Sequence, residues 1–167
     1  TQAFADMYAE YGPKVVEKVV AYHLMHGGIS RFEKFRYWHL AFLGKEICPE
    51  EVQNLGNEFS RLVKEAVIKA SWVPGAYDFL MAHHQHLPLF VASGTPDEEI
   101  QEIVERRNMA RYFVEVQGSP ASKAEIITAF CIAHGFSRDR VLMVGDSWTD
   151  YEGALSTGVR FVGRISN

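Results

Sequence analysis

Two short, uninterrupted apolar runs constrain the fold of this chain more than any other feature of its sequence. Leu87–Ala92 and Val141–Val144 have the length of strands, and neither run alternates between apolar and polar residues. A strand with that pattern is buried on both faces, as happens where helices cover both sides of a parallel sheet. The chain after residue 72 is therefore predicted to alternate strands and helices around a parallel sheet, with right-handed crossovers.

The remaining elements of this part are predicted from periodicity and from turn residues. Helices are expected at 76–84, 96–107, 122–134 and 149–157, and further strands at 112–116 and 160–162. The helix near residue 96 is preceded by Thr95-Pro96-Asp97-Glu98, the spacing of a capping box with proline at the first helical position.

Residues 1–71, in contrast, show helical periodicity and no strand pattern. Four helices are predicted there, and Ser30-Arg31-Phe32-Glu33 has the spacing of a capping box at the start of the third. Four such helices predict a helical bundle. The pattern changes at Trp72-Val73-Pro74-Gly75, so we place a boundary between a helical subdomain of residues 1–71 and an α/β core of residues 72–167.

Composition narrows the function classes. The net charge is −4 and no basic stripe is present, which argues against a nucleic-acid binder. No apolar run has membrane-spanning length, so no membrane partner is expected. Cys48 and Cys131 stand in unrelated surroundings, which favours a reduced, cytoplasmic protein. A monomer and a homodimer both remain open.

Polar residues follow both apolar runs, at the edge where a parallel sheet binds its ligands. The hydroxyl of Ser93 and the free backbone N–H groups near Gly94 could hold an anion. Asp146 follows the second run, and Asp150 lies in the first turn of the next helix. Two hard oxygen ligands suit Mg²⁺, which binds through one or two carboxylates plus substrate phosphate. Lys123, at the start of the helix between them, is expected at the same edge.

Each of these residues also has a simpler interpretation. Ser93 could form an ordinary turn, the aspartates could cap a helix, and Lys123 could face solvent. Arg31, beside the turn Gly27–Gly28, is a weaker candidate for a substrate contact, and a solvated charged face is its alternative. Three histidines lie close together without a carboxylate or cysteine, which favours a surface loop over a metal site: His83, His84 and His86.

Together these residues form an ordered series that resembles the haloacid dehalogenase superfamily, in particular its phosphoglycolate-phosphatase-like branch with a helical cap. Val91-Ala92-Ser93-Gly94 is similar to the family's serine or threonine motif, and Lys123 matches its lysine. Gly145-Asp146-Ser147-Trp148-Thr149-Asp150 matches its acidic motif GDxxxD. The resemblance covers residues 72–163, and over residues 1–71 it is one of architecture. It implies a Rossmann-like parallel core with an α-helical cap.

The resemblance also implies an activity, that of a Mg²⁺-dependent phosphatase of a small phosphorylated metabolite with an aspartyl-phosphate intermediate. Ser93 and the Gly94 N–H would hold phosphate oxygens, and Lys123 would neutralise charge. Asp146 would bind Mg²⁺ directly, and Asp150 would act on the metal more remotely, as through a water.

One family motif is missing. In the family, a DxD pair ends a central strand that precedes the cap, and neither the pair nor such a strand occurs in these residues. Without that strand, a slot of roughly 10 Å should open between the strands ending at Ala92 and Val144. We therefore expect the natural protein to be longer at its N-terminus and the ending at Asn167 to be premature. We also expect the 167 residues alone not to turn over phosphate esters.

Other functions stay open. A phosphomutase of the same fold would differ in its cap, and a non-catalytic binding module would lack the nucleophile altogether. A dehalogenase needs no metal, so Asp146 and Asp150 argue against that reading. A nicotinamide enzyme is disfavoured because no GxGxxG follows a predicted strand.

Overall fold

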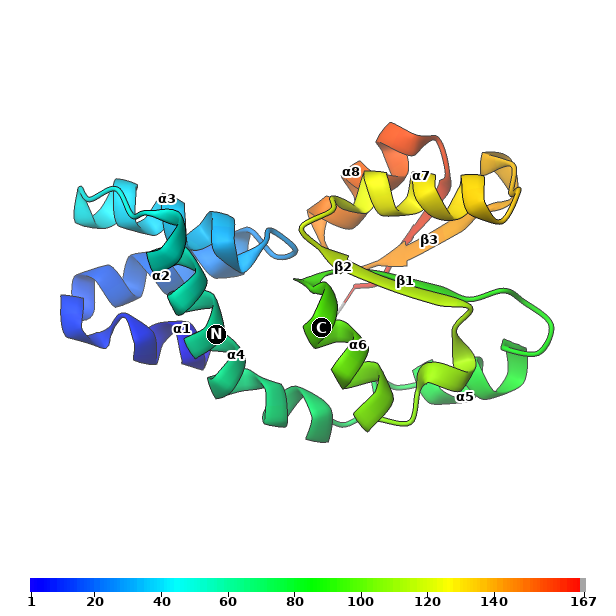
Figure 1. Cartoon of the computed structure of the whole chain (residues 1–167), viewed down its shortest axis with the longest axis horizontal. Coiled ribbons are helices and arrows are strands. Elements are labelled where there is room, and N and C mark those ends of the chain that lie inside the picture. The colour runs from blue at the N-terminus through cyan, green and yellow to red at the C-terminus, as the bar shows by residue number, and fades with distance from the viewer. Residues whose placement is uncertain (166–167) are drawn as a thin grey trace.

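The computed structural model describes residues 1–165, which form a helical part and an α/β part (Figure 1). The helical part contains α1 (Gln2–Met7), α2 (Pro13–Met25), α3 (Arg31–Leu43) and α4 (Pro49–Lys69), with a 3-10 turn at Ala9–Tyr11. The four predicted helices of this part are therefore confirmed. Residues 166 and 167, the last of the predicted core range, lie outside the described residues.

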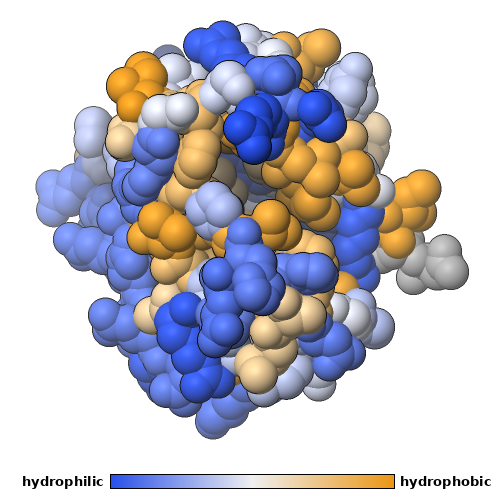
Figure 2. Space-filling view, turned by 90° about the vertical axis from the view of Figure 1, so that its right-hand side faces the viewer, coloured by the Kyte–Doolittle hydropathy of each residue, from blue (hydrophilic) through white to orange (hydrophobic). Residues whose placement is uncertain are grey.

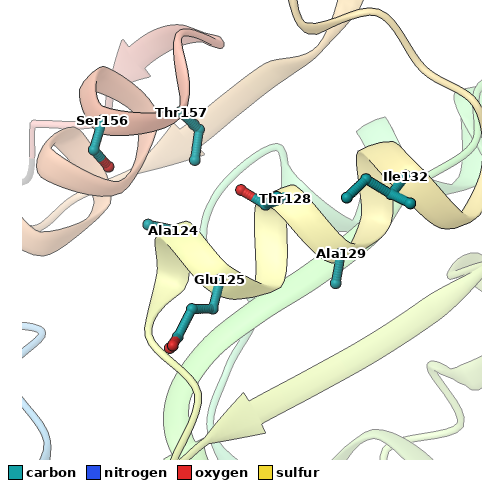
Figure 3. A pocket seen from close by; sticks show the side chains of 7 residues that line it. All are labelled: Ala124, Glu125, Thr128, Ala129, Ile132, Ser156 and Thr157. Atoms are coloured by element: carbon teal, nitrogen blue, oxygen red, sulfur yellow. The ribbon is translucent and has the colours of Figure 1, made fainter.

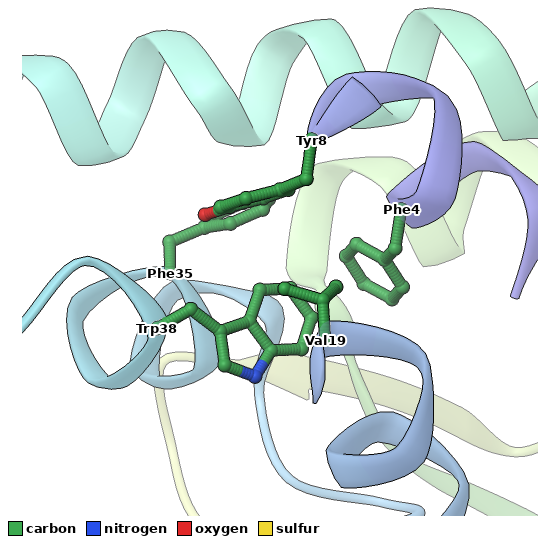
Figure 4. Packing of buried hydrophobic residues seen from close by; sticks show 5 residues of the cluster. All are labelled: Phe4, Tyr8, Val19, Phe35 and Trp38. Carbon is green, nitrogen blue, oxygen red and sulfur yellow. The ribbon is translucent and has the colours of Figure 1, made fainter. Parts of the chain in front are cut away.

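Aromatic side chains fill the centre of the helical part. Five buried residues pack together there: Phe4, Tyr8, Val19, Phe35 and Trp38 (Figure 4). The Phe4 ring meets Trp38 edge-on at 4.9 Å between centroids and stacks on Phe59 of α4 at 4.1 Å. Such pairs add to the stabilisation that large buried rings already contribute by leaving water. This cluster is the physical reason that the four helices form one body.

The α/β part alternates strands and helices, as the apolar runs predicted. Its elements are α5 (Ala76–His83), β1 (Phe90–Pro96), α6 (Asp97–Arg106), β2 (Glu115–Ser119), α7 (Lys123–Ala133), β3 (Leu142–Gly145), α8 (Trp148–Thr157) and β4 (Arg160–Gly163). Helices α7 and α8 lie on one side of the strands, and α5 and α6 lie on the other (Figure 1). The predicted α/β class, with a Rossmann-like core and a helical cap, is confirmed.

The strands pair in parallel but form two separate sheets. β1 pairs with β2, and β3 pairs with β4. Within residues 1–165 no pairing joins β1 to β3, which agrees with the expected slot between these two strands. Both facing strand edges therefore carry backbone groups that no neighbouring strand satisfies.

Three local predictions were wrong. β1 continues to Pro96, which pairs with Ser119 of β2, so Ser93 lies within the strand and α6 starts one residue later than expected. The strand expected from Tyr112 begins only at Glu115, because Tyr112 is buried in a 3-10 turn. The Ser30 side chain makes no capping hydrogen bond at the start of α3.

The burial of β3 also differs from its prediction. α8 packs against β3 and β4, but Leu142 and Val144 point to the other face and are 54% and 63% exposed. An uninterrupted apolar run therefore has one exposed face here, since only one helix layer covers it among the described residues.

Candidate functional site at the carboxyl ends of the strands

The strands run toward the helical part, so their carboxyl ends face it (Figure 1). The loop after β3 turns back sharply and opens α8 with a capping box. The Ser147 Oγ accepts a hydrogen bond from the Asp150 backbone N–H, and the carboxylate of Asp150 accepts hydrogen bonds from the hydroxyl and backbone N–H of Ser147. Gly145 makes this fold possible, because a Cβ on it would lie less than 3.0 Å from the Asp150 side chain.

Asp150 is buried beneath this loop and forms an ion pair with Lys123 from the start of α7. Its second carboxylate oxygen accepts hydrogen bonds from Asp146 N at 3.1 Å, Ser147 N at 3.0 Å and Ser147 Oγ at 2.7 Å. Burial alone would raise the pKa of Asp150. The hydrogen bonds from Lys123 and Ser147 outweigh burial, so the pKa lies below its ordinary value.

Asp146, in contrast to Asp150, has an exposed side chain. Its side chain is 64% exposed, and it pairs loosely with the Arg164 guanidinium, with Nη1 and Oδ2 3.9 Å apart. The carboxylate of Asp146 is thus available to a metal, whereas that of Asp150 is committed to Lys123 and Ser147. This donor set fits Mg²⁺, which keeps several waters and needs one or two protein carboxylates. Over residues 1–165, no three His, Cys, Asp or Glu side chains converge as a self-sufficient metal site.

Ser93 and Gly94 reach the same place from β1. The Ser93 hydroxyl accepts a hydrogen bond from the Thr95 backbone N–H at 3.1 Å, which bends the strand end. A Cβ on Gly94 would be 3.2 Å from the carbonyl oxygen of Gly28, in the turn between α2 and α3.

Gly28 also lies against the loop after β3. A Cβ on Gly28 would be less than 3.0 Å from the side chains of Ser147 and Thr149, and its φ of 85° is one that glycine adopts readily. One residue of the helical part therefore contacts the ends of both β1 and β3. Gly94 and Ser147 therefore lie on two sides of the same residue, Gly28.

Arg31 lies at the rim of this site, and its guanidinium is bound within the protein. Two of its nitrogens donate to the Glu99 carboxylate oxygens, each at 3.0 Å, and Nη1 also donates to Ser60 Oγ at 2.8 Å. Both charged side chains are only 9% exposed. The suggested contact between Arg31 and a substrate stays a prediction, and it would require the arginine to exchange one carboxylate for another.

Sequence reasoning brought forward Ser93, Lys123, Asp146 and Asp150, and it also gave the turn at Gly27–Gly28 as one that could face the site. It missed three residues. For Ser147 a signal existed, since Ser147 and Asp150 have the spacing of a capping box. For Ser60 and Glu99, the contacts join residues far apart in the chain, and no local pattern identifies them.

Another part of the described surface is less polar. A shallow hollow of about 450 Å³ lies between α7 and α8 and is lined mainly by small or apolar side chains: Ala124, Glu125, Thr128, Ala129, Ile132, Ser156 and Thr157 (Figure 3). The side of the core away from the cap carries apolar patches between hydrophilic ones (Figure 2). In the predicted histidine loop, the His84 ring makes a hydrogen bond within its own segment, with Nδ1 2.9 Å from the Leu80 carbonyl oxygen.

Comparisons with known proteins agree with this geometry. A family model described as haloacid dehalogenase-like hydrolase matches residues 1–158. A hydrolase of the haloacid dehalogenase-like family from Streptococcus pneumoniae superposes with a TM-score of 0.70 at 17% identity, over 97% of this chain and 74% of that one. A predicted phosphoglycolate phosphatase from Haemophilus somnus gives 0.67 at 21% identity, over 90% and 74%. At these identities the solved structures show the fold.

A search of curated proteins found no match to this sequence. Among the described helices, none combines the length and the apolar character that crossing a membrane requires.

Proposed function

This chain belongs to the haloacid dehalogenase-like hydrolases, and from that premise we propose that its site hydrolyses a phosphate monoester of a small metabolite with the help of Mg²⁺. The observation that carries the proposal is that two aspartates four residues apart differ in burial and in pairing. Asp150 is buried and bound to Lys123, whereas Asp146 presents an exposed carboxylate at the carboxyl end of β3. That arrangement supplies both a cation and a free oxygen ligand at one edge.

Phosphoryl transfer depends on positioning and on stabilising charge, and the described residues offer both. The Ser93 hydroxyl and the Gly94 N–H would donate to phosphate oxygens. The Lys123 ammonium, held in place by Asp150, would offset the negative charge of phosphate. Asp146 would hold Mg²⁺, which supplies neutralisation of phosphate charge when bound. The turn at Gly28 lies against Gly94 and against the loop after β3, so the cap meets the core at this site.

The proposed reaction also needs a carboxylate nucleophile, and the 167 residues contain no DxD pair. We place that nucleophile on a strand between β1 and β3, whose facing edges are unpaired within residues 1–165. Such a strand would satisfy both edges and would end beside Ser93 and Asp146, where the phosphate would bind. An aspartyl-phosphate would then form by attack of its carboxylate on phosphorus, with release of the alcohol, and water would hydrolyse it.

The test is a phosphatase assay of the native full-length protein against a panel of small phosphate monoesters, with and without Mg²⁺. We expect Mg²⁺-dependent release of phosphate, and a loss of at least a hundredfold in Asp146→Asn. Asp139→Asn is the matched control, since Asp139 is an exposed aspartate of a 3-10 turn outside the site.

Three outcomes decide between the alternatives. Release of phosphate that depends on Mg²⁺ and on Asp146 supports a phosphatase. Transfer of the phosphoryl group back to another position of the substrate identifies a phosphomutase. Binding of phosphate esters without turnover in the full-length protein identifies a binding module and contradicts the proposal.

A further inference from the structure

Among residues 1–165, a buried ion pair between Arg31 and Glu99 joins the cap and the core. Arg31 begins α3, Ser60 lies in α4, and Glu99 lies in the first turn of α6, so three elements meet there. The guanidinium and the carboxylate face each other with two hydrogen bonds, and the Ser60 hydroxyl donates to the same carboxylate. Bidentate arginine–carboxylate pairs fix orientation as well as distance.

The Arg31 guanidinium is also held from one side by an aromatic ring. Its central carbon lies 4.6 Å from the centroid of Phe59, and Phe59 stacks on Phe4 in the centre of the helical part. The arginine is therefore held by the core of the cap as well as by Glu99. A side chain immobilised in this way transmits the position of the whole cap, whereas a mobile arginine would not.

Other ionic contacts between α4 and α6 are more exposed. Lys64 and Glu102 are 31% and 40% exposed, and Arg106 and Glu65 are 41% and 54% exposed. Ion pairs of this kind contribute little, because water and salt screen them. Nearer to the linker, Arg107 donates to carbonyl oxygens at the end of α4 and so anchors the hinge end of that helix.

The buried ion pair lies beside the contact between the cap and the core at the site. Gly28 of the cap lies against Gly94 of the core, and Arg31 and Glu99 follow these glycines by three and five residues. Both partners of the ion pair are thus on the same two chain segments that meet where Gly28 lies against Gly94. A displacement of Arg31 from Glu99 would therefore loosen the contact between Gly28 and Gly94.

From this geometry we propose that Arg31, Ser60 and Glu99 form a clamp that positions the Gly27–Gly28 turn over the phosphate site. Arg31 and Glu99 are positioning residues in this view, acting on the reaction through the turn. The proposal rests on the proposed function for its kinetic consequences, but the clamp itself can be measured without any turnover.

The experiment uses the native full-length protein and its Glu99→Gln and Arg31→Met variants. Hydrogen exchange of the hydrogen-bonded amides on either side of the turn, those of His26 and Lys34, reports whether the turn stays ordered. We expect exchange at least tenfold faster in both variants. Glu102→Gln, on the same helix but in an exposed pair, is the matched control and should stay within twofold of the native protein. Ser60→Ala, which removes one hydroxyl, gives a milder version if a charge variant fails to fold.

Kinetics then separates positioning from direct substrate binding. The clamp predicts that Glu99→Gln and Arg31→Met raise KM by similar factors of tenfold or more, because both open the same turn. If Arg31→Met loses activity while Glu99→Gln keeps the activity of the native protein, the proposal is overturned and Arg31 is a substrate ligand. Unchanged exchange in Glu99→Gln would also overturn it. A protein without phosphatase activity that still shows faster exchange in the variants would refute the proposed function and leave the clamp standing.

Discussion

Replacing the buried Lys34 by methionine should stabilise the protein at neutral pH. Lys34 lies in the first turns of α3, is 3% exposed, and has its Nζ 3.1 Å from Nδ1 of His23. Burial lowers the pKa of Lys34 from its ordinary 10.5 to about 8. At about 1.4 kcal/mol per pH unit, that shift means that holding the charged lysine in the folded protein costs about 3 kcal/mol.

The sign of the pH dependence follows from the same shift. Between pH 8 and 10.5 the unfolded chain binds more protons than the folded one, so the free energy of unfolding should rise with pH across that window. In Lys34→Met this rise should be absent, and at pH 7 the variant should be more stable by up to about 3 kcal/mol. The advantage should shrink toward zero near pH 10.

Urea denaturation of the native protein, Lys34→Met and Lys14→Met, followed by circular dichroism from pH 7 to 10, measures this difference. Lys14 is an exposed lysine of α2 and serves as the control. A second reading comes from His23. Burial and the charge of Lys34 lower the pKa of His23 below its ordinary value of 6.5. In Lys34→Met that pKa should rise. A variant less stable at every pH, with no change at His23, would refute the reasoning.

Two further predictions concern the loop after β3. Asp150→Asn should lower the free energy of unfolding by about 3 kcal/mol at pH 7, because it leaves the largely buried Lys123 without its partner. Since the pKa of Asp150 is lowered in the folded protein, this contribution is present above pH 3.8 and is lost as the pH falls from 3.8 through the lower folded-state pKa. Thermal unfolding should therefore show a smaller difference at pH 3 than at pH 7. Gly145→Ala should cost at least about 2 kcal/mol in urea denaturation, since its Cβ would overlap Asp150, whereas Gly27→Ala, with open space around it, should be nearly neutral; equal effects of the two alanines would contradict the close approach.

Much of the fold was predictable because its signals are local. The helical periods of residues 1–71 and the apolar runs at 87–92 and 141–144 depend on residues a few positions apart, and the structure confirms the four helices and the parallel pairs. Errors arose where tertiary contacts outweighed the local pattern. Tyr112 carries a strand-like side chain but is buried in a turn, where its hydroxyl lies 3.2 Å from the sulfur of Met81.

The candidate site divides in the same way. The motif residues are neighbours within short segments, so the sequence by itself determined that Lys123, Asp146 and Asp150 stand at strand ends and helix starts. Ser93, expected just after its strand, lies within it. Only the tertiary structure showed how these residues differ in burial and in pairing. Asp146 and Asp150 look alike in sequence, but Lys123 from another helix buries and pairs one of them while the other stays exposed.

What the sequence determined about this protein is thus its class, the order of its elements and its candidate chemistry, because periodicity and capping act between residues a few positions apart. The tertiary structure alone decided that Arg31 meets Glu99 across 68 positions, and that Gly28 lies against both Gly94 and Ser147. Those contacts depend on how whole helices and strands pack against each other. No local pattern encodes that packing, and it determines how the cap is held over the site.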